Sequence, residues 1–247
     1  MFWKDFRSAI KSYSQASKLM KELNLWKFVL VPIGIGLLVG AAIIFVAWRM
    51  ALWVGEYVAG KWPFSWGEGF IEGLSGVIGA IVVLLLGLMA FKHIIMALAA
   101  PFMTPVSEKI EMHLTGKKLN PTDTWTEYIA AIWRATRINV RNLLLEILIT
   151  IPLFILGFIP VVNIFTTIYL FYIQSYYSGF GNMDYTLERY RNYRGTIKFV
   201  AKNKGTAAGN GFIFMLLLMI PVIGMCIALP LSTAAATIDT IKKLEEK

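Results

Sequence analysis

Long uncharged apolar runs alternate with shorter polar stretches along the chain. Two of these runs, residues 28–48 and residues 73–91, contain no charged side chain. Since about 20 apolar residues span a bilayer as a helix, each run predicts one transmembrane helix. Pro32 falls in the first turns of the first helix, where proline is tolerated. The Trp and Tyr side chains of the intervening loop, residues 49–72, are typical of an aromatic belt at the membrane surface.

Residues 1–23 predict an amphipathic helix. Its apolar positions follow a spacing of three to four residues: Trp3, Phe6, Ile10, Tyr13 and Met20. Basic side chains occupy the other faces, as in helices that lie in the headgroup plane of a bilayer, although a solvated leader would show a similar pattern. Residues 1–27 hold six Lys and Arg residues and no uninterrupted apolar core, so we expect no signal peptide here.

Local capping signals predict two further helices after the second span. Thr104 can cap a helix with Pro105 at its first position, and Gly116 can end that helix. Thr124 and Glu127 have the spacing of a capping box, which predicts that the next helix begins there.

Two later apolar segments share an unusual interruption. Each carries an Ile-Pro-Val run near its middle, in FIPVVNIF at residues 158–165 and in MIPVIGMC at residues 219–226. A proline at such a position breaks a helix. The uncharged stretches have 27 residues (147–173) and 26 residues (211–236), which is too long for one upright span and too short for two.

The distribution of positive charge decides how these two segments meet the membrane. Of the 24 Lys and Arg residues, only Arg49 and Lys61 lie between the two expected spans. The basic regions on either side of each late segment therefore belong on the cytoplasmic side, and each segment must enter the membrane and return. We expect two re-entrant hairpins, with one kinked span per segment as the alternative. Their expected tips lie at Pro160, Asn163, Pro221 and Gly224.

Together these patterns predict an all-α integral membrane protein with two transmembrane helices, two partially penetrating hairpins and an N-terminal amphipathic helix. We assign residues 1–247 to one membrane domain, made of an interfacial helix (1–23), two spans (28–48 and 73–91) and two hairpins (143–176 and 208–237). Composition agrees, because 57% of the residues are hydrophobic and only 16% are charged, against about 25% in soluble domains. The net charge of +9 fits the membrane topology better than a nucleic-acid partner. The single cysteine, Cys226, excludes an intrachain disulfide.

No enzyme signature or metal-binding motif is present, so we expect no catalytic residue, metal or cofactor. Polar groups at membrane depth are the better candidates for function. The charges considered as pore or structural groups are Arg134, Arg137, Arg141, Glu146 and Asp184. The three arginines share one helical face, which suits either an anion path or lipid phosphates. Glu146 is either a buried partner of Arg137 or Arg141, or an interfacial charge.

Two glycine-rich stretches lie near the ends of the late apolar segments. They read GFGN at residues 179–182 and GNG at residues 209–211. Such glycine pairs form either a turn or a close contact between two helices.

Several short stretches follow one another in the order WKFVLVP (26–32), APF (100–102), EKIEMHLTG (108–116), FIPVVN, MDY (183–185) and MIPVIG. This order resembles the CysZ-type sulfate permeases, which share a domain with etoposide-induced eukaryotic membrane proteins. The resemblance implies two long transmembrane helices and two partially penetrating hairpins in a homo-oligomer. It also implies passage of sulfate across the bacterial inner membrane for cysteine synthesis, with both termini in the cytoplasm.

In this family a Gly-Leu/Ile-Arg stretch at the start of the first span is linked with sulfate binding. The matching positions here are Asn24, Leu25 and Trp26, followed by Lys27, so the glycine and the first arginine are replaced. The resemblance implies an anion site at these four residues, where helix amides and a positive charge suit a tetrahedral dianion. We therefore expect a passive transporter or channel for sulfate or a similar oxyanion. A membrane scaffold that binds partners without transport is the alternative.

Overall fold

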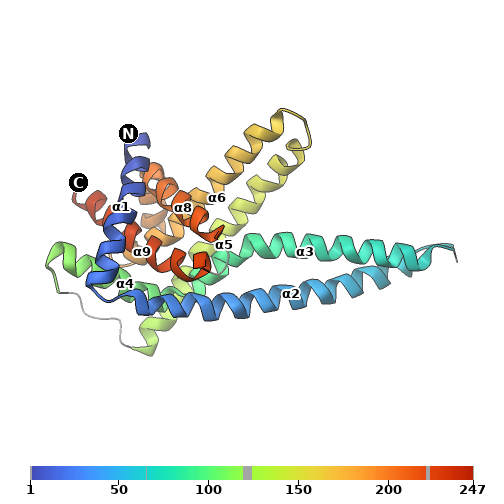
Figure 1. Cartoon of the computed structure of the whole chain (residues 1–247), viewed down its shortest axis with the longest axis horizontal. Coiled ribbons are helices and arrows are strands. Elements are labelled where there is room, and N and C mark those ends of the chain that lie inside the picture. Colours follow the sequence, from blue (N-terminus) through green and yellow to red (C-terminus); the bar gives the residue numbers. More distant parts are fainter. Residues whose placement is uncertain (1, 65, 119–123, 221–222, 247) are drawn as a thin grey trace. The chain divides into compact units, whose positions relative to one another are not determined.

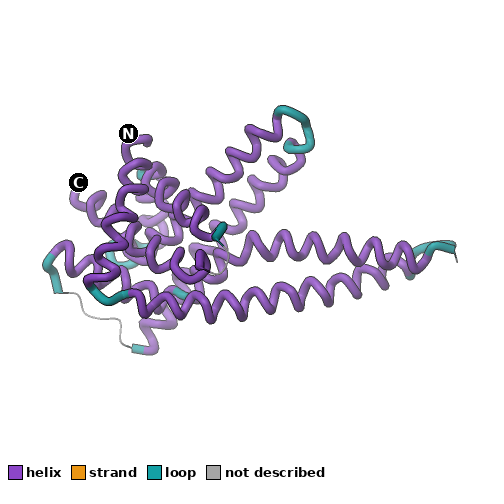
Figure 2. The backbone as a smooth tube through the Cα atoms, in the orientation of Figure 1, coloured by secondary structure: helices purple, strands orange, loops and turns teal. Residues whose placement is uncertain are grey.

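The computed structural model describes residues 2–64, 66–118, 124–220 and 223–246. All the regular structure in these residues is helical (Figures 1 and 2). The elements are α1 (Phe2–Glu22), the 3-10 helix η1 (Trp26–Val29), α2 (Leu30–Ala59), α3 (Glu68–Leu98), α4 (Ala100–Thr115), α5 (Trp125–Leu156), α6 (Val162–Leu187), α7 (Tyr193–Lys202), α8 (Lys204–Leu218) and α9 (Ile223–Glu245). They form a smaller unit, Gly36–Lys92, and a larger unit, Met1–Ile35 with His93–Lys247.

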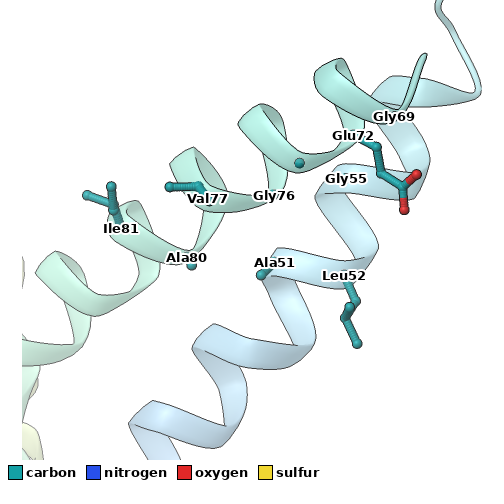
Figure 3. Close-up of a pocket in the computed structure, with 10 residues that line it drawn as sticks. Ala51, Leu52, Gly55, Gly69, Glu72, Gly76, Val77, Ala80 and Ile81 are labelled. Atoms are coloured by element: carbon teal, nitrogen blue, oxygen red, sulfur yellow. The ribbon is translucent and has the colours of Figure 1, made fainter. Parts of the chain in front are cut away.

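The smaller unit is an antiparallel pair made of most of α2 and α3 (Figure 1). Small residues let the two helices approach closely, as in other membrane helix pairs. A Cβ added at Gly76 would lie 2.7 Å from the carbonyl oxygen of Ala51, so a larger residue there would separate the helices. A groove of about 490 Å³ lies beside this contact and is lined mainly by glycine and alanine. Figure 3 shows the residues that line it.

Among the described residues, three helical stretches are long and apolar enough to cross a membrane, and two of them contain the expected spans. They are Trp26–Ala59, Glu68–Leu98 and Trp125–Leu156. The expected loop at residues 49–72 is wrong over much of its length, because α2 continues to Ala59 and α3 begins at Glu68. Isolated charges such as Arg49 do not stop a helix, whereas the helix does end where Gly60 and Pro63 follow.

The larger unit has its core where α1, α4, α6, α8 and α9 meet. The N-terminal helix α1 is amphipathic as expected, and its inner face buries Ala9, Ala16 and Met20 completely. Glycines on α8 permit this close packing, since a Cβ at Gly209 would lie 2.5 Å from the carbonyl oxygen of Phe6. Trp3 stays 69% exposed on the outer side. The placement of that outer side in the headgroup plane remains a prediction.

The first late apolar segment folds back on itself as a helical hairpin (Figure 1). Its two arms, α5 and α6, pack together, and the chain reverses between residues 157 and 161. The side-chain amide of Asn163 closes the turn by donating to the carbonyl oxygen of Gly157 at 2.7 Å. Val161 supports the reversal with a φ of +71°. Pro160 therefore lies in the turn, as expected, whereas the depth of the hairpin in the membrane remains a prediction.

The second late apolar segment is also interrupted at its expected position. Helix α8 ends at Leu218 and α9 begins at Ile223. Gly224 lies against the end of α8, because a Cβ there would be 1.9 Å from the carbonyl oxygen of Leu217. The chain therefore doubles back here, although Pro221 itself lies outside the described residues.

The two glycine-rich stretches form a close contact between α6 and α8, one of the two expected alternatives. A Cβ added at Gly179 would lie 1.8 Å from the carbonyl oxygen of Ala207. A Cβ added at Gly211 would lie 1.7 Å from the carbonyl oxygen of Ser175. The backbones of the two helices touch, and only glycine leaves room for this contact.

Two of the expected helix ends are confirmed and one is wrong. The capping box of Thr124 and Glu127 is formed, and Gly116 ends α4 in the left-handed conformation. Thr104, by contrast, is not an N-cap, because Pro101 opens α4 one turn earlier and Thr104 falls inside the helix. The basic stretch after α6 holds a helix that we did not expect, α7, whose N-cap Asn192 accepts from the amide of Gly195.

Candidate functional site

The expected anion site lies where α1 ends and η1 leads into α2. Asn24 turns the chain with a φ of +52°. The amides of Asn24 and Leu25 donate to carbonyl oxygens at the end of α1, at 3.2 and 2.9 Å, and the Leu25 side chain is fully buried. These two amides are therefore engaged within the protein, and the accessible polar part of the site narrows to Trp26 and Lys27.

Lys27 has a basic neighbour that the sequence did not reveal. The Lys27 Nζ lies 5.7 Å from the centre of the Phe28 ring, and the Lys109 Nζ lies 5.9 Å from the same centre. Lys109 comes from α4, so the fold brings a second ammonium group to the start of the first span. Two cations beside one aromatic ring form a positive patch, which we call the Phe28 patch, with Lys27, Phe28 and Lys109 as its members.

The three arginines of α5 each contact other side chains within the protein. Arg134 donates to the Asp184 carboxylate and to the Thr196 hydroxyl, both at 2.9 Å. The Arg137 guanidinium lies 4.1 Å above the ring of Tyr193. These contacts tie α5 to α6 and α7.

Arg141 is likewise engaged within the protein. It donates to the side-chain oxygen of Asn142 at 3.0 Å and lies 5.7 Å from the centre of the Phe180 ring. Any anion that uses these arginines must compete with partners already in place.

Glu146 is completely buried, and one of its neighbours is a histidine. Its Oε2 lies 3.0 Å from the Nε2 of His93, and the Nδ1 of His93 lies 3.3 Å from the side-chain oxygen of Asn139. All three side chains are buried. This arrangement joins the end of α3 to α5.

A second buried charge pair links α4 to the end of α6. Arg189 donates through Nε and Nη2 to one oxygen of Glu111, at 3.0 and 2.7 Å, and also to Ser107 at 2.7 Å. The hydroxyl of Tyr190 donates to the other oxygen of Glu111. Because the hydrogen bonds satisfy the buried carboxylate, this pair anchors the two helices firmly.

A cavity of about 250 Å³ is lined by Arg134 and Arg189, which pair with Asp184 and Glu111 respectively. Its charged lining comprises Glu108, Glu127, Arg134, Glu188 and Arg189. Thr104 also lines it and donates its hydroxyl to Glu188 at 2.6 Å. We call it the Arg134–Arg189 cavity.

Two carboxyl groups have altered acidity: Glu188, which lines this cavity, and Asp184, which pairs with the cavity residue Arg134. Burial, as the main cause, raises the pKa of Glu188 to about 7. Burial also raises the pKa of Asp184, although its ion pair with Arg134 opposes the rise. Near neutral pH Glu188 therefore exchanges a proton readily, and each protonation removes one negative charge from beside the two arginines.

These features define a helical membrane protein whose larger unit holds the ion pairs Arg134–Asp184 and Arg189–Glu111. Within the described ranges, no group of three or more His, Cys, Asp or Glu side chains could hold a metal ion. The family model described as Sulfate transporter CysZ/Etoposide-induced protein 2.4 matches residues 12–228. Because this match covers most of the chain, the protein belongs to that family.

Its similarity to curated relatives extends over nearly the full length. A protein named Sulfate transporter CysZ from Pseudomonas fluorescens strain Pf0-1 is 28% identical over 231 residues, which are 92% of this chain and 90% of the relative. The protein of the same name from Pseudomonas paraeruginosa strain PA7 is 26% identical over 232 residues, 93% of each chain. A third, from Vibrio cholerae strain O395, is 24% identical over 241 residues, 94% of this chain and 92% of the relative.

Proposed function

We propose that the protein is a passive transporter or channel for sulfate, or a similar oxyanion, in the bacterial inner membrane. In this proposal it works as a homo-oligomer, supplies sulfate for cysteine synthesis and has both termini in the cytoplasm. The names of its relatives support sulfate as the substrate. The observation that carries the proposal is the Phe28 patch, because it brings two positive charges together at the start of the first span.

The Phe28 patch is suited to the first encounter with a dianion. Lys27 is exposed, so its charge is available to attract an anion from solution. Glu108 precedes Lys109 directly in α4, and Glu108 lines the Arg134–Arg189 cavity. We propose that the anion is attracted at the Phe28 patch and is then held near Arg134 and Arg189, with Glu188 protonated.

Helix length supports partial penetration by the second hairpin. Helix α8 has 15 residues, and at a rise of about 1.5 Å per residue it is roughly 22 Å long. That length is less than the hydrocarbon thickness of about 30 Å. Helix α5 is long enough to cross a membrane, so the first hairpin has the length to reach deeper than the second.

Sulfate uptake into proteoliposomes tests this function. Wild-type protein, with insertion verified, should take up labelled sulfate well above empty vesicles. The double variant Lys27→Ala/Lys109→Ala should lower uptake at least about tenfold, since both charges of the patch are lost. Lys18→Ala, an exposed charge elsewhere on α1, is the matched control and should keep wild-type uptake. Uptake by wild-type protein equal to that of empty vesicles would refute transport and favour the scaffold interpretation.

A further inference from the structure

A second charged cavity lies between α1, α8 and α9. Its volume is about 370 Å³, and its lining includes Asp5, Thr206, Asp239, Lys242 and Lys243. It shares no lining residue with the Arg134–Arg189 cavity or the Phe28 patch. We call it the Asp239 cavity, and its size falls within the usual range for small-molecule sites, about 300–1,000 Å³.

The inner wall of the Asp239 cavity holds two buried acceptors without hydrogen-bond partners among the described residues. Asp239 is 4% exposed; one of its oxygens accepts from Ser12 at 2.7 Å, and the other has no partner. Thr206 is 2% exposed, and its hydroxyl also has no partner. Unsatisfied polar atoms at such depth are rare in native proteins and require an explanation.

The charges around Asp239 restrict what can satisfy it. Lys243 is already paired with Asp5 at 2.9 Å and with Glu246 at 2.8 Å. Asp239 therefore contributes the one carboxylate oxygen that is buried and unpaired in this lining, among the residues described. Ca²⁺ and Mg²⁺ take six or more oxygen ligands, so a donor with a single positive charge fits better.

The outer wall carries positive charge. Lys4 and Lys242 line the Asp239 cavity, are exposed, and form no ion pair with any described residue. Two ammonium groups there favour an acidic group on the same ligand. Burial is the main cause that raises the pKa of Asp239 to about 6, so its carboxylate is mostly ionised at neutral pH and can accept from a cation.

We propose that the Asp239 cavity binds a small zwitterion that joins a primary ammonium group to a carboxylate or phosphate. The ammonium group would donate to the free oxygen of Asp239 and to the hydroxyl of Thr206. The acidic group would face Lys4 and Lys242. Two sources share this chemistry, namely a free α-amino acid and the headgroup of an ethanolamine phospholipid.

Calorimetric titration of the full chain in detergent tests the proposal and separates the two sources. The probes are L-serine and glycerophosphoethanolamine. Propionate lacks the ammonium group, ethylamine lacks the acidic group, and glycerophosphocholine cannot donate a hydrogen bond from its quaternary ammonium. We expect L-serine, glycerophosphoethanolamine or both to bind, and these three controls to bind at least about tenfold more weakly.

Variants assign the binding to named groups. Asp239→Asn keeps the shape of the side chain and the acceptor for Ser12, and should weaken binding at least about tenfold. The double variant Lys4→Gln/Lys242→Gln changes exposed positions only, so it tests the site even if the buried variant fails to fold. It should also weaken binding, whereas Lys18→Gln should not. The proposal is overturned if neither L-serine nor glycerophosphoethanolamine binds wild-type protein, a result that would leave only ordered water in the cavity. It is also overturned if Lys4→Gln/Lys242→Gln binds these zwitterions as tightly as Lys18→Gln does.

Discussion

Replacement of Glu188 by glutamine should make the protein more stable in mildly alkaline buffer. Burial raises the pKa of Glu188 from its ordinary value of 4.5 to about 7. A carboxyl group whose pKa is higher in the folded state binds its proton more tightly there than in the unfolded state. Its stabilising effect is therefore complete below pH 4.5 and is lost as the pH rises through about 7.

The size of the effect follows from the pKa change. Each unit corresponds to about 1.36 kcal/mol, so the change at Glu188 corresponds to roughly 3 kcal/mol. Solvent reaches part of the side chain, and we therefore expect about 1–3 kcal/mol. Glutamine carries no charge at any pH and its amide oxygen can still accept from Thr104, so the variant should not lose this stability.

Thermal unfolding in detergent at pH 5 and pH 8 measures this difference. The wild-type Tm should fall more between the two pH values than the Tm of Glu188→Gln, by about 2–10 °C for a chain of this size. Glu22→Gln, at an exposed carboxylate on α1, should behave like the wild type. Equal pH dependence in Glu188→Gln and wild type would refute the assignment of a raised pKa to Glu188.

Three further substitutions test the packing and the pairs. Gly179→Ala should lower the free energy of unfolding, measured by chemical denaturation, by at least about 3 kcal/mol, because its Cβ would overlap a backbone oxygen. The control Gly34→Ala, where nothing lies within 4 Å of the added Cβ, should change that free energy by no more than about 1 kcal/mol. Equal effects of the two variants would contradict the contact. Arg134→Ala should lower the free energy of unfolding by about 3–5 kcal/mol, because it leaves Asp184 buried and unpaired. The double variant Arg134→Ala/Asp184→Ala should recover part of that loss. No recovery in this double-mutant cycle would argue against the pair. Thr124→Ala should lower the free energy of unfolding by about 1 kcal/mol, because the capping box is lost. An unchanged unfolding midpoint would show that the capping box contributes nothing to stability.

Features that depend on neighbouring residues could be predicted from the sequence. The two apolar spans, the Thr124 capping box and the Gly116 helix end all arise from signals within a few residues of one another. The reversals at Pro160 and after Leu218 could be inferred because proline position and charge distribution constrain the same segment.

The partners of the buried charges could not be predicted in the same way. Arg134 and Asp184 are 50 residues apart, and Arg189 and Glu111 are 78 residues apart. Each residue has several possible partners in the sequence, and only the packing of α4, α5 and α6 selects among them. Lys109 was missed for this reason, since a single lysine on a helix carries no local sign that a second lysine lies beside the same ring.

The backbone contact between Gly179 and Gly211 has a consequence for movement. Sliding α6 along α8 would move the glycines out of this contact, and a residue with a Cβ in their place would overlap a carbonyl oxygen of the other helix. The two helices therefore keep a fixed register and should move together as a single rigid body. If passage of an anion requires a conformational change, we expect the displacement to occur in α5 or at the turn of residues 157–161, where the chain is not held by such a contact.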